Sequence, residues 1–304
     1  MRVLVTGAGG MIGRAVCDAL LARGDAVVGL SRSPERARRN NLKVEWHAWN
    51  PTLERPPEEA LAGVDAVVNL IGEPINQRWT DEAKQRIRES RITATRNLVT
   101  AMLAAETPPK VLVSQSAVGY YGDRGEQVVD ESTPAGSSFD ARVCADWEAA
   151  AEEVATVGEI RLVILRSAPV LTAEGGLLAE LLLPFRLGLG GPIAGGRNYM
   201  PWISLVDEVG MILWALDTPA ASGTYNATAP DPITNREFSK ALGRALNRPA
   251  VVPVPKLALR LRLGGELAET ATGSQRVLPR RARDDGYTFR LPDIDSALAE
   301  ALAG

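Results

Sequence analysis

Met1-Arg-Val-Leu-Val-Thr-Gly-Ala-Gly-Gly-Met-Ile-Gly13 is the stretch that decides the fold of this chain. Its apolar run, residues 2–6, predicts a strand, and the periodic pattern of residues 12–23 predicts a helix. The glycines between them suit a tight turn, a close approach to a diphosphate, and a helix packed closely on a strand. This context predicts a dinucleotide-binding βαβ unit rather than a turn without a ligand.

Free N–H groups at the start of such a helix face the anion, so this turn is where we expect the diphosphate. The residues expected to hold it are Gly7, Gly10, Met11, Ile12 and Gly13.

The first half of the chain alternates strand and helix patterns, which is typical of a parallel sheet covered on both faces. A strand such as Ala66-Val-Val-Asn-Leu-Ile71 is apolar almost throughout, as burial on both faces requires. The predicted fold class is therefore α/β, a Rossmann-type doubly wound parallel sheet. The strands are expected at residues 2–6, 26–31, 43–48, 65–70, 111–115 and 161–166, and the helices at 12–23, 34–39, 57–62, 80–105 and 139–156.

The second half changes character. Residues 171–202 are rich in Gly, Leu and Pro, which indicates loops, and a short strand pattern lies at Tyr225-Asn-Ala-Thr228. We expect a smaller, loop-rich α/β C-terminal lobe, with helices at 206–217, 235–246, 256–270 and 293–302. The predicted division is a dinucleotide-binding domain at 1–170, to which 203–228 returns, and a substrate-binding lobe at 171–202 and 229–304.

Composition excludes several classes of protein. The chain has 304 residues, 45% of them hydrophobic, and a net charge of −3, so nothing draws it to nucleic acid or an anionic membrane. Its apolar runs are too short to span a bilayer, and a strand at residue 2 leaves no room for a signal peptide. Cys17 and Cys144 fall in helical patterns and predict no disulfide, so we expect a cytoplasmic protein. The single histidine, His47, is expected to be a partly buried residue of a strand, and no metal site is predicted.

The end of the second strand selects the cofactor in this fold. An acidic residue there binds the ribose hydroxyls of NAD, whereas a basic residue favours the 2′-phosphate of NADP. Here Ser31 stands in the acidic position and Arg32 follows, with Arg36 nearby. A guanidinium can hold a phosphate with two parallel hydrogen bonds, so we expect NADP(H). Arg38 and Arg39 are expected on a solvated helix face.

The chain resembles the extended short-chain dehydrogenases/reductases of the NAD-dependent epimerase/dehydratase superfamily. The matching stretches are Thr6–Gly13, Asp65–Gly72, Thr95–Leu98, Ser114–Gly122, Arg166–Val170 and Trp202–Asp207. It is similar to an atypical subgroup, the epimerase family proteins, at Gly72–Ile75, Arg78–Trp79, Ser90–Arg91, Asp146–Glu148, Met200–Trp202 and Gly273–Pro279. The resemblance implies further cofactor contacts at Leu70, Ile71, Gly72, Ser114, Cys144 and Pro169.

Catalytic members of this superfamily use a Ser, a Tyr and a Lys, with the Tyr and Lys four residues apart on one helix. Ser116 matches the serine. On the helix beginning at Phe139, however, Asp140 stands at the position of the Tyr and Cys144 at that of the Lys, and no Tyr-x-x-x-Lys occurs in the chain. The resemblance therefore implies nicotinamide binding more directly than it implies dehydrogenase chemistry.

Two residues are candidates for the missing acid. Tyr120, four residues after Ser116, can present its hydroxyl to the site or pack as a loop aromatic. Asp140 can act if burial raises its pKa, or serve as a solvated carboxylate at a helix start. Asp140, Cys144 and Glu148 share a helix face, and Cys144 has no neighbour in sequence that activates its thiol.

The substrate pocket is expected at the carboxyl edge of the sheet. Glu73, Arg78 and Trp79 follow the fourth strand there, and Arg91 can reach an anionic group or pair with Glu73. Tyr199 and Trp202 can wall the pocket, although core packing is an equal reading for Trp79 and Trp202.

Two functions remain open. The first is an NADP(H)-dependent oxidoreductase or epimerase acting on a small polar molecule, with Ser116, Tyr120 and Asp140 as its catalytic residues. The second is an NADP(H)-binding sensor or regulator without catalysis, which the missing Tyr and Lys suggest. We expect a small-molecule partner, no nucleic acid, no membrane, and a monomer or homodimer.

Overall fold

The computed structural model describes residues 1–157 and 159–303 and is built around one seven-stranded sheet. All its strand pairs are parallel, and their order is β11-β7-β5-β4-β1-β2-β3. The order reverses direction at β1, as in a doubly wound Rossmann fold, so the predicted fold class is confirmed. The strands are β1 (Arg2–Thr6), β2 (Ala26–Ser31), β3 (Glu45–Ala48), β4 (Ala66–Asn69), β5 (Val111–Ala117), β7 (Arg161–Ser167) and β11 (Gly223–Ala227).

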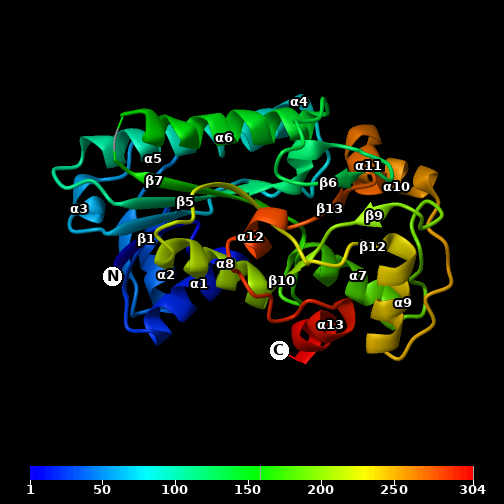
Figure 1. Ribbon diagram of the computed structural model, residues 1–304. Coiled ribbons are helices and arrows are strands. Elements are labelled where there is room, and N and C mark those ends of the chain that lie inside the picture. Colours follow the sequence, from blue (N-terminus) through cyan, green and yellow to red (C-terminus); the bar gives the residue numbers. More distant parts are fainter. Residues whose placement is uncertain (158, 304) are drawn as a thin grey trace.

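Helices cover both faces of this sheet (Figure 1). Alternation along β1 explains why: Val3 and Val5 join one buried cluster, which includes Val16 of α1, whereas Leu4 joins another, which includes Leu98 of α5. The helices α1 (Met11–Ala22), α2 (Pro34–Asn40) and α8 (Leu205–Asp217) lie on one side, and α4 (Asp81–Glu89), α5 (Ile92–Ala104) and α6 (Phe139–Val157) on the other. The short α3 (Glu58–Leu61) precedes β4.

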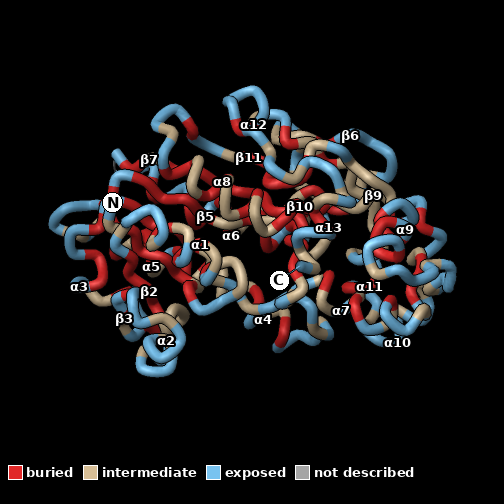
Figure 2. The backbone as a smooth tube through the Cα atoms, turned by 90° about the horizontal axis from the view of Figure 1, so that it is seen from below, coloured by how far each residue is buried: buried red, intermediate tan, exposed pale blue. Residues whose placement is uncertain are grey.

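The C-terminal lobe has a core of its own beyond the carboxyl edge of the sheet. Phe185, Trp202, Phe238 and Leu298 are buried together there, and Figure 2 shows buried segments in this part of the molecule as well as in the sheet. The lobe contains α7 (Gly176–Arg186), α9 (Asn235–Ala245), α10 (Lys256–Leu263), α11 (Gly265–Thr272), α13 (Ile294–Ala303) and the paired strands β8 (Val170–Leu171) with β10 (Ile203–Ser204) and β9 (Tyr199–Met200) with β12 (Ile233–Thr234).

Part of the C-terminal region packs back on the nucleotide-binding sheet. β13 (Arg276–Val277) pairs with β6 (Val128–Val129), and α12 (Arg280–Asp284) packs on β11. Val277, Ala282 and Tyr287 belong to the same buried cluster as Val3 and Val5. The chain therefore crosses between its two parts several times.

Two predicted helices are each divided. The helix expected at 80–105 ends at Glu89 and begins again at Ile92. At the break, the Ser90 hydroxyl donates to the backbone carbonyl of Ile87 and accepts the backbone N–H of Glu73. The helix expected at 256–270 is interrupted at Gly264, whose φ of 88° no helix contains. A short 3₁₀ turn, η1 (Val118–Tyr121), follows β5.

The loop prediction for residues 171–202 was wrong in part, because this stretch holds α7. Leu178, Leu182 and Phe185 are buried at helical spacing and anchor that helix in the lobe's core. The glycines and Pro184 concealed the pattern.

Candidate functional site

The glycine turn between β1 and α1 has the geometry that its sequence predicts. Gly7 has a φ of 64°, and a side chain there would meet the carbonyl oxygen of Leu70 at 2.7 Å. A side chain at Gly13 would collide with the carbonyl oxygen of Gly7, so this glycine lets α1 begin directly against the turn. Both positions need glycine for the fold itself.

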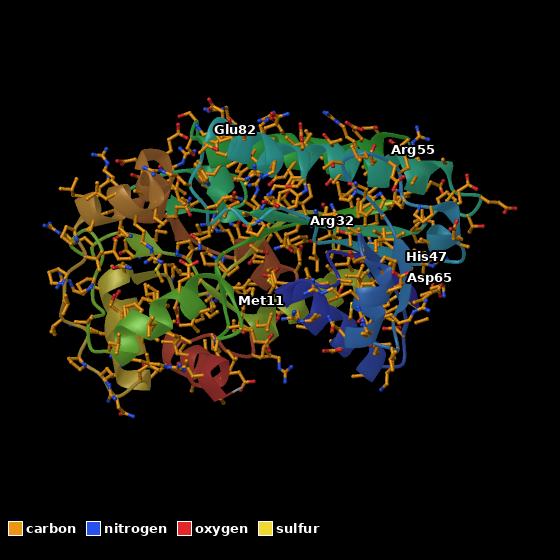
Figure 3. The ribbon with its side chains drawn as sticks, turned by 180° about the vertical axis from the view of Figure 1, so that it is seen from behind. Met11, Arg32, His47, Arg55, Asp65 and Glu82 are labelled. Atoms are coloured by element: carbon orange, nitrogen blue, oxygen red, sulfur yellow. The ribbon has the colours of Figure 1, made fainter. Side chains whose placement is uncertain are left out.

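Gly9 and Gly10 differ from these two because a side chain at either position would point into open space rather than into protein. A Cβ at Gly9 would meet nothing within 4 Å, and one at Gly10 would meet only the Gly7 carbonyl oxygen, at 3.1 Å. Gly10 caps α1 without a side-chain hydrogen bond, so the start of the helix is left for an anion. Met11 lies in the middle of Figure 3, where the sheet domain meets the C-terminal lobe, and His47 lies farther out. The turn fits the diphosphate of a dinucleotide.

The end of β2 offers free positive charge. Arg32 and Arg36 are exposed, and neither forms an ion pair within residues 1–157 and 159–303. The Ser31 hydroxyl accepts the backbone N–H of Ser33 and shapes the turn into α2. Two unpaired guanidinium groups beside the nucleotide turn are suited to a phosphate.

A buried polar network fixes the carboxyl edge of the sheet. Thr6 donates to Asn69 and accepts the backbone N–H of Leu70, and Asn69 donates to Ser114 and Thr95. Ser114 is therefore a buried support, whereas Leu70 and Ile71 are half-buried at the edge and Gly72 and Pro169 are exposed there.

Ser116 stands in a second buried network, between β5, α6 and β7. Its hydroxyl donates a 2.5 Å hydrogen bond to Glu148, and the Arg166 guanidinium grips the same carboxylate at 2.7 and 2.9 Å. Burial alone lowers the pKa of Arg166, but the hydrogen bonds and charge of Glu148 raise it above its usual range. The Arg166 guanidinium thus stays charged, and Ser116 hydrogen-bonds to a carboxylate that Arg166 fixes.

Tyr120 and Tyr121 complete this network. The Arg166 guanidinium carbon lies 3.4 Å from the centre of the Tyr120 ring, and the two tyrosine rings meet edge to face. The Tyr121 hydroxyl is buried between Arg166 and Asn226, and its burial raises the pKa to about 12. Tyr121 is therefore structural, and Tyr120 is the half-buried tyrosine beside Ser116.

Asp140 and Cys144, which share a face of α6 with Glu148, do not belong to this network. Asp140 lies at the start of α6 against Gly119, with its carboxylate 3.5 Å from the Thr270 hydroxyl of α11. Cys144 is 5% exposed, and burial and the neighbouring carboxylates raise the pKa of its thiol to about 12. The thiol of Cys144 is therefore protonated and unreactive.

The loop after β4 lies over this edge. The backbone of Glu73 is tied to Ser90 and Arg91, and the Glu73 carboxylate accepts a hydrogen bond from Gln77. Trp79 packs edge to face on Phe139, with ring centres 5.0 Å apart. Arg78 is exposed and lies beside Gly264, between α10 and α11.

On the C-terminal side, the two aromatic candidates separate. Tyr199 is half-buried and stacks on Arg276, whereas Trp202 is 1% exposed within the core of the lobe. Core packing is therefore the role that the structure gives Trp202, although its indole N–H has no partner among the described residues.

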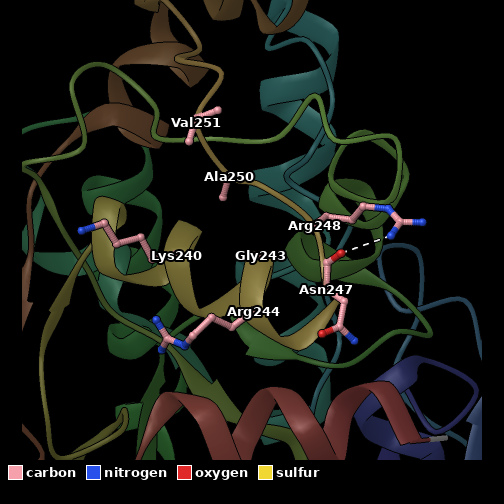
Figure 4. A pocket seen from close by; sticks show the side chains of 7 residues that line it. All are labelled: Lys240, Gly243, Arg244, Asn247, Arg248, Ala250 and Val251. Carbon is pink, nitrogen blue, oxygen red and sulfur yellow. Dashed lines mark hydrogen bonds between the residues drawn. The ribbon is translucent and has the colours of Figure 1, made fainter.

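An open hollow of about 660 Å³ lies elsewhere, beside α9 (Figure 4). Its arginines have internal partners, since Arg244 pairs with Asp295 at 2.7 Å and Arg248 donates to backbone carbonyls. It is lined by Lys240, Gly243, Arg244, Asn247, Arg248, Ala250 and Val251, none of which belongs to the nucleotide edge.

Sequence reasoning missed two partnerships. It noted Glu148 and Arg166 in separate motifs but not their pairing, and it did not single out Glu208. Glu208 is fully buried on α8, accepts hydrogen bonds from Gln115 and Ser167, and burial raises its pKa to about 7. The position of Glu208, in the first turn of an otherwise apolar helix, was the sequence feature that could have identified it.

Within residues 1–157 and 159–303, no cluster of three or more His, Cys, Asp or Glu residues has the arrangement of a metal site. No helix described in that range is long and apolar enough to cross a bilayer.

Comparisons with known proteins agree with this geometry. The model of the NAD dependent epimerase/dehydratase family matches residues 3–228, and a domain of unknown function, DUF1731, matches residues 254–301. The chain is 40% identical over 300 residues to an epimerase family protein of Mycobacterium leprae, covering 98% of this chain and 95% of that one.

Solved structures give the same picture. Human epimerase family protein SDR39U1, crystallised with NADPH, is 35% identical with a TM-score of 0.90, covering 100% of this chain and 99% of that one. A UDP-glucuronic acid 4-epimerase from Bacillus cereus, solved with NAD, is 18% identical with a TM-score of 0.78 over 100% of this chain and 99% of that one, which shows the fold alone. The family match covers most of the chain and includes the glycine turn, so this protein belongs to the NAD dependent epimerase/dehydratase family.

Proposed function

We propose that this protein binds NADP(H) and acts as an oxidoreductase or epimerase on a small polar substrate. The observation that carries the proposal is the glycine turn, which is open beyond Gly9 and Gly10 and flanked by the unpaired Arg32 and Arg36. The human relative that was crystallised with NADPH supports the choice of cofactor. When bound, the nicotinamide supplies or accepts a hydride.

The residues expected to hold the cofactor lie along one edge. Gly10, Met11, Ile12 and Gly13 would meet the diphosphate at the start of α1, with Gly7 shaping the turn. Arg32 and Arg36 would hold the 2′-phosphate beside Ser31. The exposed or half-buried Leu70, Ile71, Gly72 and Pro169 would line the rest of the edge.

Tyr120 is our choice for the group that exchanges a proton with the substrate. It follows Ser116 by one short turn, and Arg166 fixes its ring from one side. Asp140 is the weaker candidate, because it lies at the helix start against Gly119 and Thr270. Ser116 would position the reacting oxygen, and its own hydroxyl is oriented by Glu148.

The test begins with titrations of the purified protein with NADPH and NADH, followed by a turnover screen of small carbonyl and hydroxyl compounds. We expect saturable binding with a strong preference for NADPH. On the best substrate, Tyr120→Phe should lower kcat at least a hundredfold with NADPH affinity unchanged, as for loss of a general acid. An Asp140→Asn variant with the larger loss would transfer the role to Asp140, and failure to bind either dinucleotide would refute the proposal.

The second candidate is an NADP(H)-binding sensor or regulator without turnover. It is favoured by the missing Tyr-x-x-x-Lys and by Ser116, whose hydroxyl proton is already directed to Glu148. Tight NADPH binding with no turnover across the panel would support this candidate over the enzyme.

We also propose a reducing, cytoplasmic environment and a monomer or homodimer. The two cysteines, Cys17 and Cys144, are both buried and unpaired, which supports the first point.

A further inference from the structure

Arg91 is a cation that the protein holds firmly but does not neutralise. Its Nη1 donates to the backbone carbonyls of Glu73 and Ile87, at 2.9 and 3.3 Å. Within residues 1–157 and 159–303, its Nε and Nη2 have no hydrogen-bond partner, and no carboxylate lies within ion-pair distance. Arg91 is half-buried, and an arginine withdrawn from water normally has an anionic partner.

The guanidinium is also packed between neighbouring groups. A Cβ at Gly72 would lie 3.0 Å from its central carbon, so the glycine is what allows the group to lie there. The same carbon lies 5.1 Å from the centre of the Trp147 ring. One nitrogen, Nη1, is thus held by hydrogen bonds, and the N–H groups of Nε and Nη2 remain available for a ligand.

The neighbouring carboxylate is engaged elsewhere. Glu73 receives Arg91 on its carbonyl, whereas its side chain accepts from Gln77 and lies 3.7 Å from Arg86. Glu73 therefore forms no ion pair with Arg91, although its charge acts on the guanidinium from a distance. Burial lowers the pKa of Arg91, an effect that a bound anion would reverse.

Arg91 also lies close to the proposed catalytic residues. Gly72 is exposed at the carboxyl edge, three residues after the end of β4. Trp147, whose ring lies 5.1 Å from the guanidinium carbon of Arg91, precedes Glu148 on α6, and Glu148 accepts the hydroxyl proton of Ser116. An anion on Arg91 would therefore lie at the carboxyl edge of the sheet, where β4 and β5 are neighbours and Ser116 lies near the end of β5.

We infer that Arg91 is the anchor for an anionic group, a carboxylate or phosphate, on the molecule that reacts at Ser116. This inference rests on the proposed function and narrows its substrate class to anionic compounds. A fixed guanidinium with free donors binds such oxyanions with paired hydrogen bonds.

The test uses NADPH-loaded protein and inorganic phosphate, with acetate as the carboxylate probe, followed by ligand-observed NMR at low ionic strength. We expect saturable binding of both probes to the loaded protein. Arg91→Gln should weaken this binding at least tenfold, and Arg91→Lys should weaken it less. Arg88→Gln is the matched control, since Arg88 lies three residues earlier and pairs with Asp146 on the surface.

Three results would overturn the inference. They are no probe binding to the loaded wild-type protein, equal binding by Arg91→Gln, and competition between phosphate and NADPH, which would assign Arg91 to the cofactor's own phosphates. If Arg91→Gln does not fold, Arg91→Lys and the competition experiment still test whether Arg91 binds the anion. Failure of the proposed function is a separate outcome, because it is absence of NADPH binding, measured on the same sample before any probe is added.

Discussion

Ser116 and Glu148 are joined by a 2.5 Å hydrogen bond across the contact between β5 and α6, and Arg166 donates to both oxygens of the same carboxylate. The three side chains lie between 1% and 6% exposed. In this chain a carboxylate therefore orients the serine, and an arginine from β7 fixes that carboxylate.

Glu148→Gln removes the negative charge while keeping the shape of the side chain. The buried Arg166 would lose its ion-pair partner, so we expect the free energy of unfolding to fall by about 3–5 kcal/mol. Urea denaturation measures this. The control Glu153→Gln breaks the exposed pair with Arg96, for which we expect a loss of about 1 kcal/mol or less. Equal losses in the two variants would contradict the argument.

Gly10→Ala tests the open side of the glycine turn. Its methyl group would meet only one protein atom, at 3.1 Å, so the protein should fold. The same methyl group would fill space assigned to the diphosphate, so we expect NADPH affinity to fall at least tenfold. Gly265→Ala, whose Cβ would also meet open space but far from the turn, should bind normally. Fluorescence titration compares the two, and unchanged binding by Gly10→Ala would move the diphosphate elsewhere.

Arg32→Ala tests the cofactor preference. Loss of a charge-assisted bond to the 2′-phosphate should weaken NADPH binding by about tenfold to a hundredfold and leave NADH binding nearly unchanged. Arg38→Ala, on the exposed end of α2, should alter neither. A parallel loss for NADPH and NADH in Arg32→Ala would show a role unrelated to the 2′-phosphate.

Glu208 predicts a pH dependence of stability. Burial raises its folded pKa from 4.5 to about 7, so the folded protein retains a proton that the unfolded chain releases. Stability from this group is present below about pH 4.5 and is lost as the pH rises to about 7, by up to about 3 kcal/mol. Its Oε2 has no partner among the described residues, in accord with a neutral carboxyl.

Glu208→Gln should remove this loss. Chemical denaturation at pH 5 and pH 8 would then show a smaller decline for Glu208→Gln than for the wild type. Glu300→Gln, at an exposed position of α13, should retain the wild-type decline. If the stability of the wild type and of both variants falls by the same amount, Glu208 is ionised in the folded protein at pH 5 as well as at pH 8.

Local pattern was enough to predict the glycine turn, the alternating strands and the free Arg32. It was not enough for Glu148 and Arg166, which are 18 residues apart and meet only through the rotation of α6 and the register of β7. α7 was missed because Gly175, Gly176 and Pro184 indicate loops locally, while the burial of Leu178 and Phe185 that stabilises the helix is tertiary.

The return of the C-terminal region to the sheet has a consequence for how the chain can be divided. The epimerase match ends at residue 228, yet Val277, Ala282 and Tyr287 fill the core beneath β1 and β11. A truncation at that boundary would leave apolar surface of the sheet open to water. The two family matches thus share one buried core, and we expect a fragment that ends at residue 228 to aggregate rather than persist as an autonomous nucleotide-binding domain.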